Sequence, residues 1–216
     1  MERIIFVDKP SEMTSFGVVV RVRRILSEEE GQKVKVGHTG TLDPFATGLM
    51  VLLAGKATKK APEYSKLDKI YEATIRLGAT STTGDPEGDI HENADITEVE
   101  REKLVQVLKG FVGEIEQTPP IFSAIKINGE RAYKLARKGK EVEMPTRRVM
   151  IYELELLDYA WPYVKIRTHV SSGTYIRSLA EDIGKELGVG AYVASLRRTK
   201  VGEFDLAQVP LMPVPK

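Results

Sequence analysis

The sequence predicts an α+β domain built on a mixed, mainly antiparallel sheet that helices flank. The segment 69–77 alternates apolar and polar residues, as a half-buried strand does. The segments 147–159 and 163–170 are rich in strand-forming residues and join near Trp161-Pro162, which is typical of a long antiparallel hairpin. Helical patterns are interspersed among these strand patterns, and this mixture favours the α+β class.

The chain begins with a predicted strand and helix. Residues 3–7 are expected to form a buried strand that ends at Pro10, because proline cannot donate to a sheet ladder. Thr14 or Ser15 is expected to cap a helix through about residue 27. Next come a glycine-rich loop at 37–48, a short buried strand at 49–54, and a Lys-rich helical segment at 56–66.

The middle of the chain alternates between polar loops and short elements. Residues 80–95 are rich in Gly, Pro and Asp and predict a loop. Thr97 and Glu100 form a capping-box pattern, which predicts a helix through about residue 111. A short apolar strand is expected after Pro120, and Asn128-Gly129 predicts a tight hairpin turn. A small basic helix is then expected at 131–138.

The last elements close the domain. Residues 171–174 are expected to cap a helix over 175–187, and residues 192–200 and 201–204 are expected to form two strands. With 216 residues the chain can bury a sizeable core, so we expect a single domain over 1–216 with an insertion at about 119–148.

Composition excludes several classes of protein. With 42% hydrophobic and 29% charged residues and no apolar run near the roughly 18 that span a bilayer, the chain is expected to be cytoplasmic, with no membrane partner. The absence of cysteine removes disulfides, thiolate nucleophiles and Cys-ligated zinc. The three histidines lie far apart in sequence, so we expect no metal site.

The net charge of +1 hides two segments of opposite sign. Residues 85–105 hold eight acidic residues against two basic ones, whereas residues 119–148 hold eight basic residues against three acidic ones. Local Lys/Arg density with interleaved aromatics suits a polyanion-binding surface. A solvated helix face explains the same charges equally well.

The loop 37–49 is the best candidate for chemistry. It contains three glycines, His38, Asp43 and Pro44 just before an apolar run. Proline fixes its own φ and favours an extended conformation at Asp43, so the carboxylate points in a defined direction. The alternative is a structural turn in which Asp43 accepts backbone hydrogen bonds.

A single aspartate can act as a nucleophile or as a base if a cation and an apolar or aromatic wall surround it. Arg177, near the start of a mostly apolar helix, is a candidate for that cation. Without a buried acid it would instead extend its guanidinium to solvent.

The basic segment 119–148 could clamp RNA, with Lys and Arg along the phosphates and Phe122 or Tyr133 against bases or against the body of the protein. The alternative is a surface excursion that packs on the sheet, with Tyr133 in the core.

Together these motifs resemble the TruB family of tRNA pseudouridine synthases. The similarity covers roughly residues 3–202 in family order, and its most specific part is the Gly-His-x-Gly-Thr-Leu-Asp-Pro element at 37–44. The matching segments are 8–10, 13–15, 37–48, Tyr71 with 76–78, 119–126 with Tyr133, 173–177 and 195–198.

The resemblance implies the pseudouridine-synthase fold and a cofactor-free isomerase acting on the tRNA T-stem-loop. Such an enzyme converts uridine 55 to pseudouridine by cleaving the N-glycosidic bond, rotating the uracil and rejoining it through C5. Whether the aspartate attacks the ribose, adds to the uracil ring or deprotonates the sugar stays open.

The resemblance also implies roles for individual residues. Asp43 would be the catalytic aspartate and Arg177 its partner. Tyr71 would stack on the target base and could serve in proton removal. Leu196 would complete the pocket wall, and His38 would fill the space that a flipped nucleotide leaves. The implied contacts to substrate RNA also include Lys9, Tyr175, Lys126, Tyr133 and Arg137, the last three within the thumb-like insertion.

The sequence departs from the family pattern in two places. Glu12 stands where many members have glycine. The chain also ends at Lys216, whereas bacterial members usually continue into a PUA domain, so we expect a version without that domain that relies more on the thumb. We expect a monomer. The alternatives are a non-catalytic RNA-binding or tRNA-folding protein and a guide-dependent rRNA pseudouridine synthase. A hydrolase with an aspartate nucleophile is disfavoured, because no water-activating base or metal cluster accompanies Asp43 in the sequence.

Overall fold

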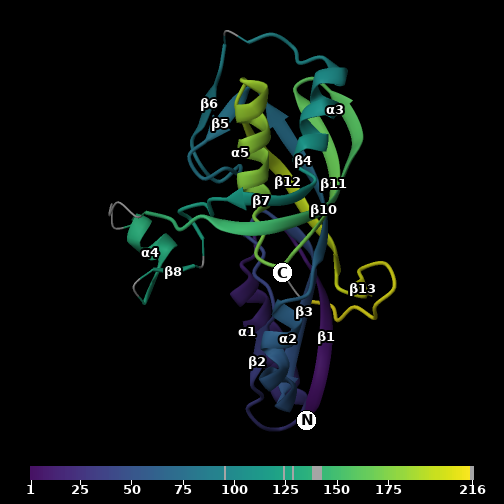
Figure 1. The fold of residues 1–216 in the computed structure, drawn as a ribbon. Coiled ribbons are helices and arrows are strands. Elements are labelled where there is room, and N and C mark those ends of the chain that lie inside the picture. Colours follow the sequence, from purple (N-terminus) through teal and green to yellow (C-terminus); the bar gives the residue numbers. More distant parts are fainter. Residues whose placement is uncertain (95, 124, 128, 138–142, 215–216) are drawn as a thin grey trace. The chain divides into compact units, whose positions relative to one another are not determined.

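The structure, a computed structural model, describes residues 1–94, 96–123, 125–127, 129–137 and 143–214. The chain divides into two compact units, and each is described by itself (Figure 1). The first unit comprises residues 1–72 and 196–216, and the second comprises residues 73–195. The expectation of a single domain over 1–216 stays a prediction.

A sheet forms the centre of the first unit. Strand β1 (Glu2–Lys9) pairs antiparallel with β3 (Thr47–Gly55), and the short β2 (Val36–His38) also pairs with β3. The end of β12 (Ala191–Val201) runs parallel to β3, with Arg198 opposite Gly48. The remaining elements are α1 (Ser15–Glu29), η1 (Lys56–Lys60), α2 (Ala61–Ser65) and β13 (Phe204–Asp205).

Helix α1 forms for the reasons that the sequence predicts. The Thr14 hydroxyl accepts a hydrogen bond from the Gly17 amide at 2.9 Å and caps the first turn. One face of the helix is buried and packs against β2. The buried residues on this face include Val18, Val19, Val22 and Leu26.

The second unit holds four sheet strands in the order β4-β11-β10-β7. These are β4 (Lys69–Leu77, which begins in the first unit), β11 (Tyr163–Val170), β10 (Arg147–Ala160) and β7 (Gly113–Gln117). Helices α3 (Arg101–Gly110) and α5 (Ile176–Leu187) lie side by side in this unit, and α3 also contacts β10 (Figure 1). The alternation predicted for β4 is confirmed, because Tyr71, Ala73, Ile75 and Leu77 are buried.

Two small hairpins accompany these strands. Strand β5 (Ala79–Ser81) pairs with β6 (Ile90–Glu92), so the segment predicted as a loop carries a hairpin. Strand β8 (Lys126–Ile127) pairs with β9 (Glu130–Arg131), which confirms the tight turn, and α4 (Ala132–Arg137) follows. The predicted end of α4 at 138–139 lies outside the described residues.

Several predicted boundaries are wrong. Helix α3 begins after Glu100 without a side-chain cap, because the preceding Val99 is buried outside the helix and its carbonyl accepts from the Tyr159 hydroxyl. Residues 171–174 do not cap α5, since the Ser171 hydroxyl instead accepts from the Met150 amide at 2.9 Å. The last two strands divide at a turn over 202–203, with Val201 still in β12. Among the described residues no helix is long and apolar enough to cross a membrane.

The close pairing of β3 with β12 requires glycine at position 48. Gly48 has φ +107°, and a Cβ there would lie 2.3 Å from the Arg198 carbonyl oxygen.

We therefore expect Gly48→Ala to lower the free energy of unfolding by at least about 2 kcal/mol, measured by urea denaturation. The matched control is Gly110→Ala, at the end of α3 with open space around it, which should be neutral or stabilise by up to about 1 kcal/mol. Equal stability of the two variants would contradict this explanation of Gly48.

Candidate functional site

The loop that carries Asp43 leaves the sheet of the first unit in a fixed conformation. Its beginning, predicted as loop, is strand β2, which pairs with β3 up to His38 and Leu52. The Thr39 amide and hydroxyl both donate to the Val51 carbonyl at 3.1 Å. Further on, the Ala46 amide donates to the Asp43 carbonyl at 3.1 Å and closes a turn around Pro44.

The residues on both sides of Asp43 are held by other segments. The Ser15 hydroxyl donates to the Leu42 carbonyl and accepts from the Leu42 amide, both at 2.8 Å. The Pro44 carbonyl accepts from the Glu12 amide at 2.9 Å and from the Lys9 ammonium at 3.0 Å. The backbone on both sides of Asp43 is therefore held in position by helix α1 and strand β1. Asp43 itself is half-buried.

Lys9 is fully buried, which is rare for lysine. Its ammonium donates to the carbonyls of Pro10, Met13 and Pro44 at 2.8, 2.6 and 3.0 Å. These bonds give Lys9 a positioning role in the loop. Its predicted contact with RNA stays a prediction.

Arg198 fastens the two ends of the same loop. It is 2% exposed, and its Nε donates to the Leu49 carbonyl at 2.8 Å while Nη2 donates to the Gly40 carbonyl at 3.1 Å. In the sequence Arg198 stands out only as part of the motif at 195–198, and no local pattern predicts these contacts. Arg198 also affects Lys69 at the start of β4. Burial of the Lys69 ammonium and, to a smaller extent, repulsion by the charge of Arg198 lower the pKa of Lys69 to about 8.

The first unit also contains three other predicted site residues. Tyr71 on β4 and Leu196 on β12 are buried, and His38 at the end of β2 is half-buried. The roles predicted for these three residues stay predictions.

Arg177 lies in the first turn of α5 in the second unit and is 3% exposed. Its Nη1 donates to the Thr83 carbonyl and its Nη2 to the Phe122 carbonyl, both at 2.8 Å. Nη1 also lies 3.3 Å from Oδ2 of Asp85, and both side chains are only 4% exposed. Arg177 therefore does not extend to solvent.

Asp85 is a buried acid that is not among the predicted site residues. The Thr83 hydroxyl donates to its Oδ1 at 2.6 Å and the Glu87 amide donates to the same oxygen at 3.0 Å. The signal for it in the sequence is the Thr-Gly-Asp-Pro turn at 83–86, because turn aspartates commonly hold neighbouring backbone groups.

Glu181 lies one turn along α5 from Arg177. Burial raises the pKa of Glu181, while the charge of Arg177 lowers it.

Tyr175 is the residue that precedes α5. Its amide donates to Gln117 Oε1 at 2.7 Å, and Gln117 Nε2 donates to the Tyr175 carbonyl at 3.0 Å. The Arg147 guanidinium carbon lies 4.9 Å from the centre of the Tyr175 ring, in cation–π contact. The predicted RNA contact Tyr175 is thus fixed in place by strands β7 and β10.

Three predicted RNA contacts lie in the thumb-like insertion. Lys126 belongs to β8, and Tyr133 and Arg137 belong to α4. The structure places their backbones, and their side-chain roles stay predictions.

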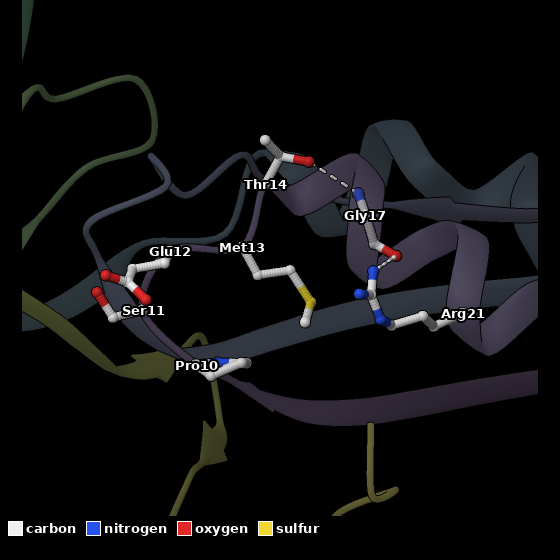
Figure 2. A pocket seen from close by; sticks show the side chains of 7 residues that line it. All are labelled: Pro10, Ser11, Glu12, Met13, Thr14, Gly17 and Arg21. Carbon is white, nitrogen blue, oxygen red and sulfur yellow. Dashed lines mark hydrogen bonds between the residues drawn. The ribbon is translucent and has the colours of Figure 1, made fainter. Parts of the chain in front are cut away.

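A pocket of about 400 Å³ opens beside the turn that leads into α1 (Figure 2). Glu12 in this turn has φ +66°, in the left-handed region that favours glycine. The glycine that the resemblance implies at this position would suit that conformation, and the turn adopts it with Glu12 in place. The pocket is lined by Pro10, Ser11, Glu12, Met13, Thr14, Gly17 and Arg21, and by none of the predicted catalytic residues.

In the part of the chain that the structure describes, no group of three or more His, Asp and Glu side chains is arranged to hold a metal ion. The expectation that the protein uses no metal stays a prediction.

Solved structures share the fold. The chain matches one in the structure titled "Crystal Structure of a Cbf5-Nop10-Gar1 Complex" with a TM-score of 0.71 and 34% identity, covering 94% of this chain and 49% of that one. A second match, "Structure of H/ACA RNP bound to a substrate RNA containing 2'-deoxyuridine", has a TM-score of 0.68 and 31% identity, covering 94% and 48%. The chain thus spans about half the length of these chains, and the predicted α+β pseudouridine-synthase fold is confirmed.

Curated relatives cover nearly the whole chain. A protein named tRNA pseudouridine synthase B from Parabacteroides distasonis is 48% identical over 204 residues, which are 94% of this chain and 87% of the relative. Proteins of the same name from Fusobacterium nucleatum and Azoarcus sp. are 48% and 46% identical, covering 95% and 96% of this chain and 70% and 67% of the relatives.

Two family models together match most of the chain. The model for the N-terminal domain of TruB family pseudouridylate synthase matches residues 23–176, and the model for the tRNA pseudouridylate synthase B C-terminal domain matches residues 177–214. With the relatives, these matches show that the chain belongs to the TruB family of pseudouridine synthases.

Proposed function

We propose that this protein is a tRNA pseudouridine synthase that isomerises uridine 55 in the T-loop. The family membership and the curated relatives named tRNA pseudouridine synthase B support this function. We further propose that it acts without a metal or cofactor, as a monomer in the cytoplasm.

The hydrogen bonds that hold the residues on both sides of Asp43 are the observation that supports this proposal most strongly. Ser15 holds the residue before Asp43, and Lys9 and Glu12 hold the residue after it. A structural turn needs none of this precision, whereas a catalytic carboxylate must be preorganised relative to its substrate.

The overall reaction fits the residues present. The uracil leaves C1′ of the ribose through N1 and returns through C5, so one C–N bond breaks and one C–C bond forms. The proton on C5 is lost and N1 gains one, so no water, oxidant or reductant is consumed. The carboxylate of Asp43 is the group we propose for the bond exchange at the uridine, and we propose that Tyr71 stacks on the uracil.

Reaching the uridine requires taking it out of its stack, which costs a few kcal/mol. We propose that His38 fills the space left in the loop and that Tyr71 and Leu196 receive the base. Arg177 is proposed to stabilise the charge of Asp43, and the insertion at about 119–148, with Lys126, Tyr133 and Arg137, to hold the RNA. In the second unit Arg177 is preorganised for this by the carbonyls of Thr83 and Phe122 and by Asp85.

Replacing the carboxylate of Asp43 tests the proposed function. We expect Asp43→Asn to reduce the rate of pseudouridine formation at least about 1,000-fold, equivalent to about 4 kcal/mol, while the Kd for a T-stem-loop RNA stays within about three-fold. The measurements are single-turnover product formation and RNA binding.

The matched control is Asp8→Asn, which removes a carboxylate of the same unit that pairs with Arg197 at 2.7 Å in a partly exposed position. It should leave the rate within about three-fold of the wild type. Product formed by Asp43→Asn at the wild-type rate would rule out Asp43 as the catalytic group, and a wild-type protein that binds the RNA without forming product would favour a binding or folding role.

Asp85 provides a second test, as a positioning residue that acts through Arg177. Asp85→Asn keeps an acceptor for the Thr83 hydroxyl but removes the charge beside Arg177. We expect kcat to fall by about 10- to 100-fold with little change in RNA affinity, and the melting temperature to decrease, because breaking a buried ion pair leaves a charge uncompensated.

Glu92→Gln is the control, since it breaks an exposed bidentate pair with Arg76 at 2.7 and 2.8 Å in the same unit. Its kcat should stay near the wild type. If folded Asp85→Asn had the kcat of Glu92→Gln, the role of Asp85 would be purely structural.

A further inference from the structure

Besides Arg177, the second unit contains another arginine with buried guanidinium nitrogens, Arg147. It is the first residue of β10 and lies opposite Gln117 of β7. Gln117 in turn holds the backbone of Tyr175, over whose ring the Arg147 guanidinium lies. The strand pairing, the Gln117 hydrogen bonds and the ring contact together fix this guanidinium in one place.

One edge of the Arg147 guanidinium has no hydrogen-bond partner among the residues that the structure describes. Nε and Nη2 are both buried, and neither donates to an acceptor of these residues. The N–H groups on these two atoms point in the same direction and form the fork that binds two oxygens of one carboxylate or phosphate. Buried N–H groups of a charged side chain are costly to leave unpaired, so an unused fork calls for a ligand.

The neighbouring Arg148 differs in every respect. It is exposed, and its guanidinium lies 3.2 Å from Glu114 and 3.9 Å from Glu116. The acidic side chains of β7 thus compensate Arg148, while Arg147 meets the aromatic face of Tyr175. An aromatic ring stabilises the charge of Arg147 but accepts no in-plane hydrogen bond, so the fork stays available.

Gly173 packs close to the guanidinium of Arg147. A Cβ at position 173 would lie 3.4 Å from Nη1, 3.6 Å from the guanidinium carbon and 3.9 Å from Nη2. The absence of a side chain at Gly173 therefore leaves room beside this guanidinium.

We propose that the Nε–Nη2 fork of Arg147 binds one phosphodiester of the substrate RNA, at the nucleotide that contacts Tyr175. This inference rests on the proposed function and adds to it a specific phosphate subsite. The ligand must offer two oxygens in one plane and carry negative charge, and an RNA backbone supplies such a group at every nucleotide. Because both atoms are buried in the structure, RNA binding must first expose this edge.

The test compares wild type, Arg147→Ala and Arg147→Lys with the control Arg167→Ala, at an exposed arginine of β11 outside the insertion. The Kd for an unmodified T-stem-loop RNA is measured by fluorescence anisotropy as a function of KCl concentration, and thermal unfolding confirms that each variant folds. We expect Arg147→Ala to weaken binding roughly ten-fold or more and to reduce the salt slope by about 1. Arg147→Lys should keep the slope but recover only part of the affinity, because an ammonium cannot form the fork. Arg167→Ala should change the Kd by less than about two-fold.

A set of RNAs with one neutral methylphosphonate each locates the phosphate. One position should weaken binding to wild type but not to Arg147→Ala, and every other position should affect both proteins equally. If Arg147→Ala bound like Arg167→Ala, or every methylphosphonate cost the same in both proteins, the subsite would not exist. Should Arg147→Ala fail to fold, wild-type affinity of Arg147→Lys would equally overturn the proposal.

The same reactions are assayed for pseudouridine with wild type. Absence of product there would contradict the proposed function, while the binding comparison would still decide the role of Arg147.

Discussion

The carbonyl groups on both sides of Asp43 are held from outside its loop, and the geometry of the candidate site depends on this constraint. Ser15 of α1 fixes Leu42, and Lys9 at the end of β1 fixes Pro44. Because Lys9 is fully buried, any movement of Pro44 would cost a buried ammonium one of its hydrogen bonds. The shape of the loop and the burial of this charge therefore stabilise each other.

The same arrangement occurs at one buried arginine of each unit. Arg198 donates to the carbonyls of Leu49 and Gly40, and Arg177 donates to those of Thr83 and Phe122. Carbonyl dipoles satisfy the N–H groups of a cation but leave its net charge in place. Each unit thus keeps a buried positive charge, which favours a polyanionic substrate. At Arg177 part of that charge is offset by Asp85, a pairing that desolvation makes a poor source of stability and that suits a positioning role.

Local patterns in the sequence predicted the elements that depend on local physics. The alternation of β4, the β10–β11 hairpin and the Thr14 cap of α1 all follow from periodicity or turn chemistry. The three-residue strands β2 and β5 were missed, because they are too short to show a period and form only by pairing with a partner. The partners of the buried charges were missed for a related reason. Arg198 reaches Leu49 across 149 residues, and no local pattern encodes such a contact. The Asp43 loop itself was found through a motif, whereas the side chains that hold it became visible only in the folded chain.

We propose that this fold isomerises one uridine of the T-loop. The most direct measurement is to incubate the purified protein with an unmodified full-length tRNA transcript and to map pseudouridine at nucleotide resolution. We expect stoichiometric pseudouridine at position 55 alone, without added metal, cofactor or guide RNA. Product at a different position, or no product from a folded protein that binds the tRNA, would contradict it.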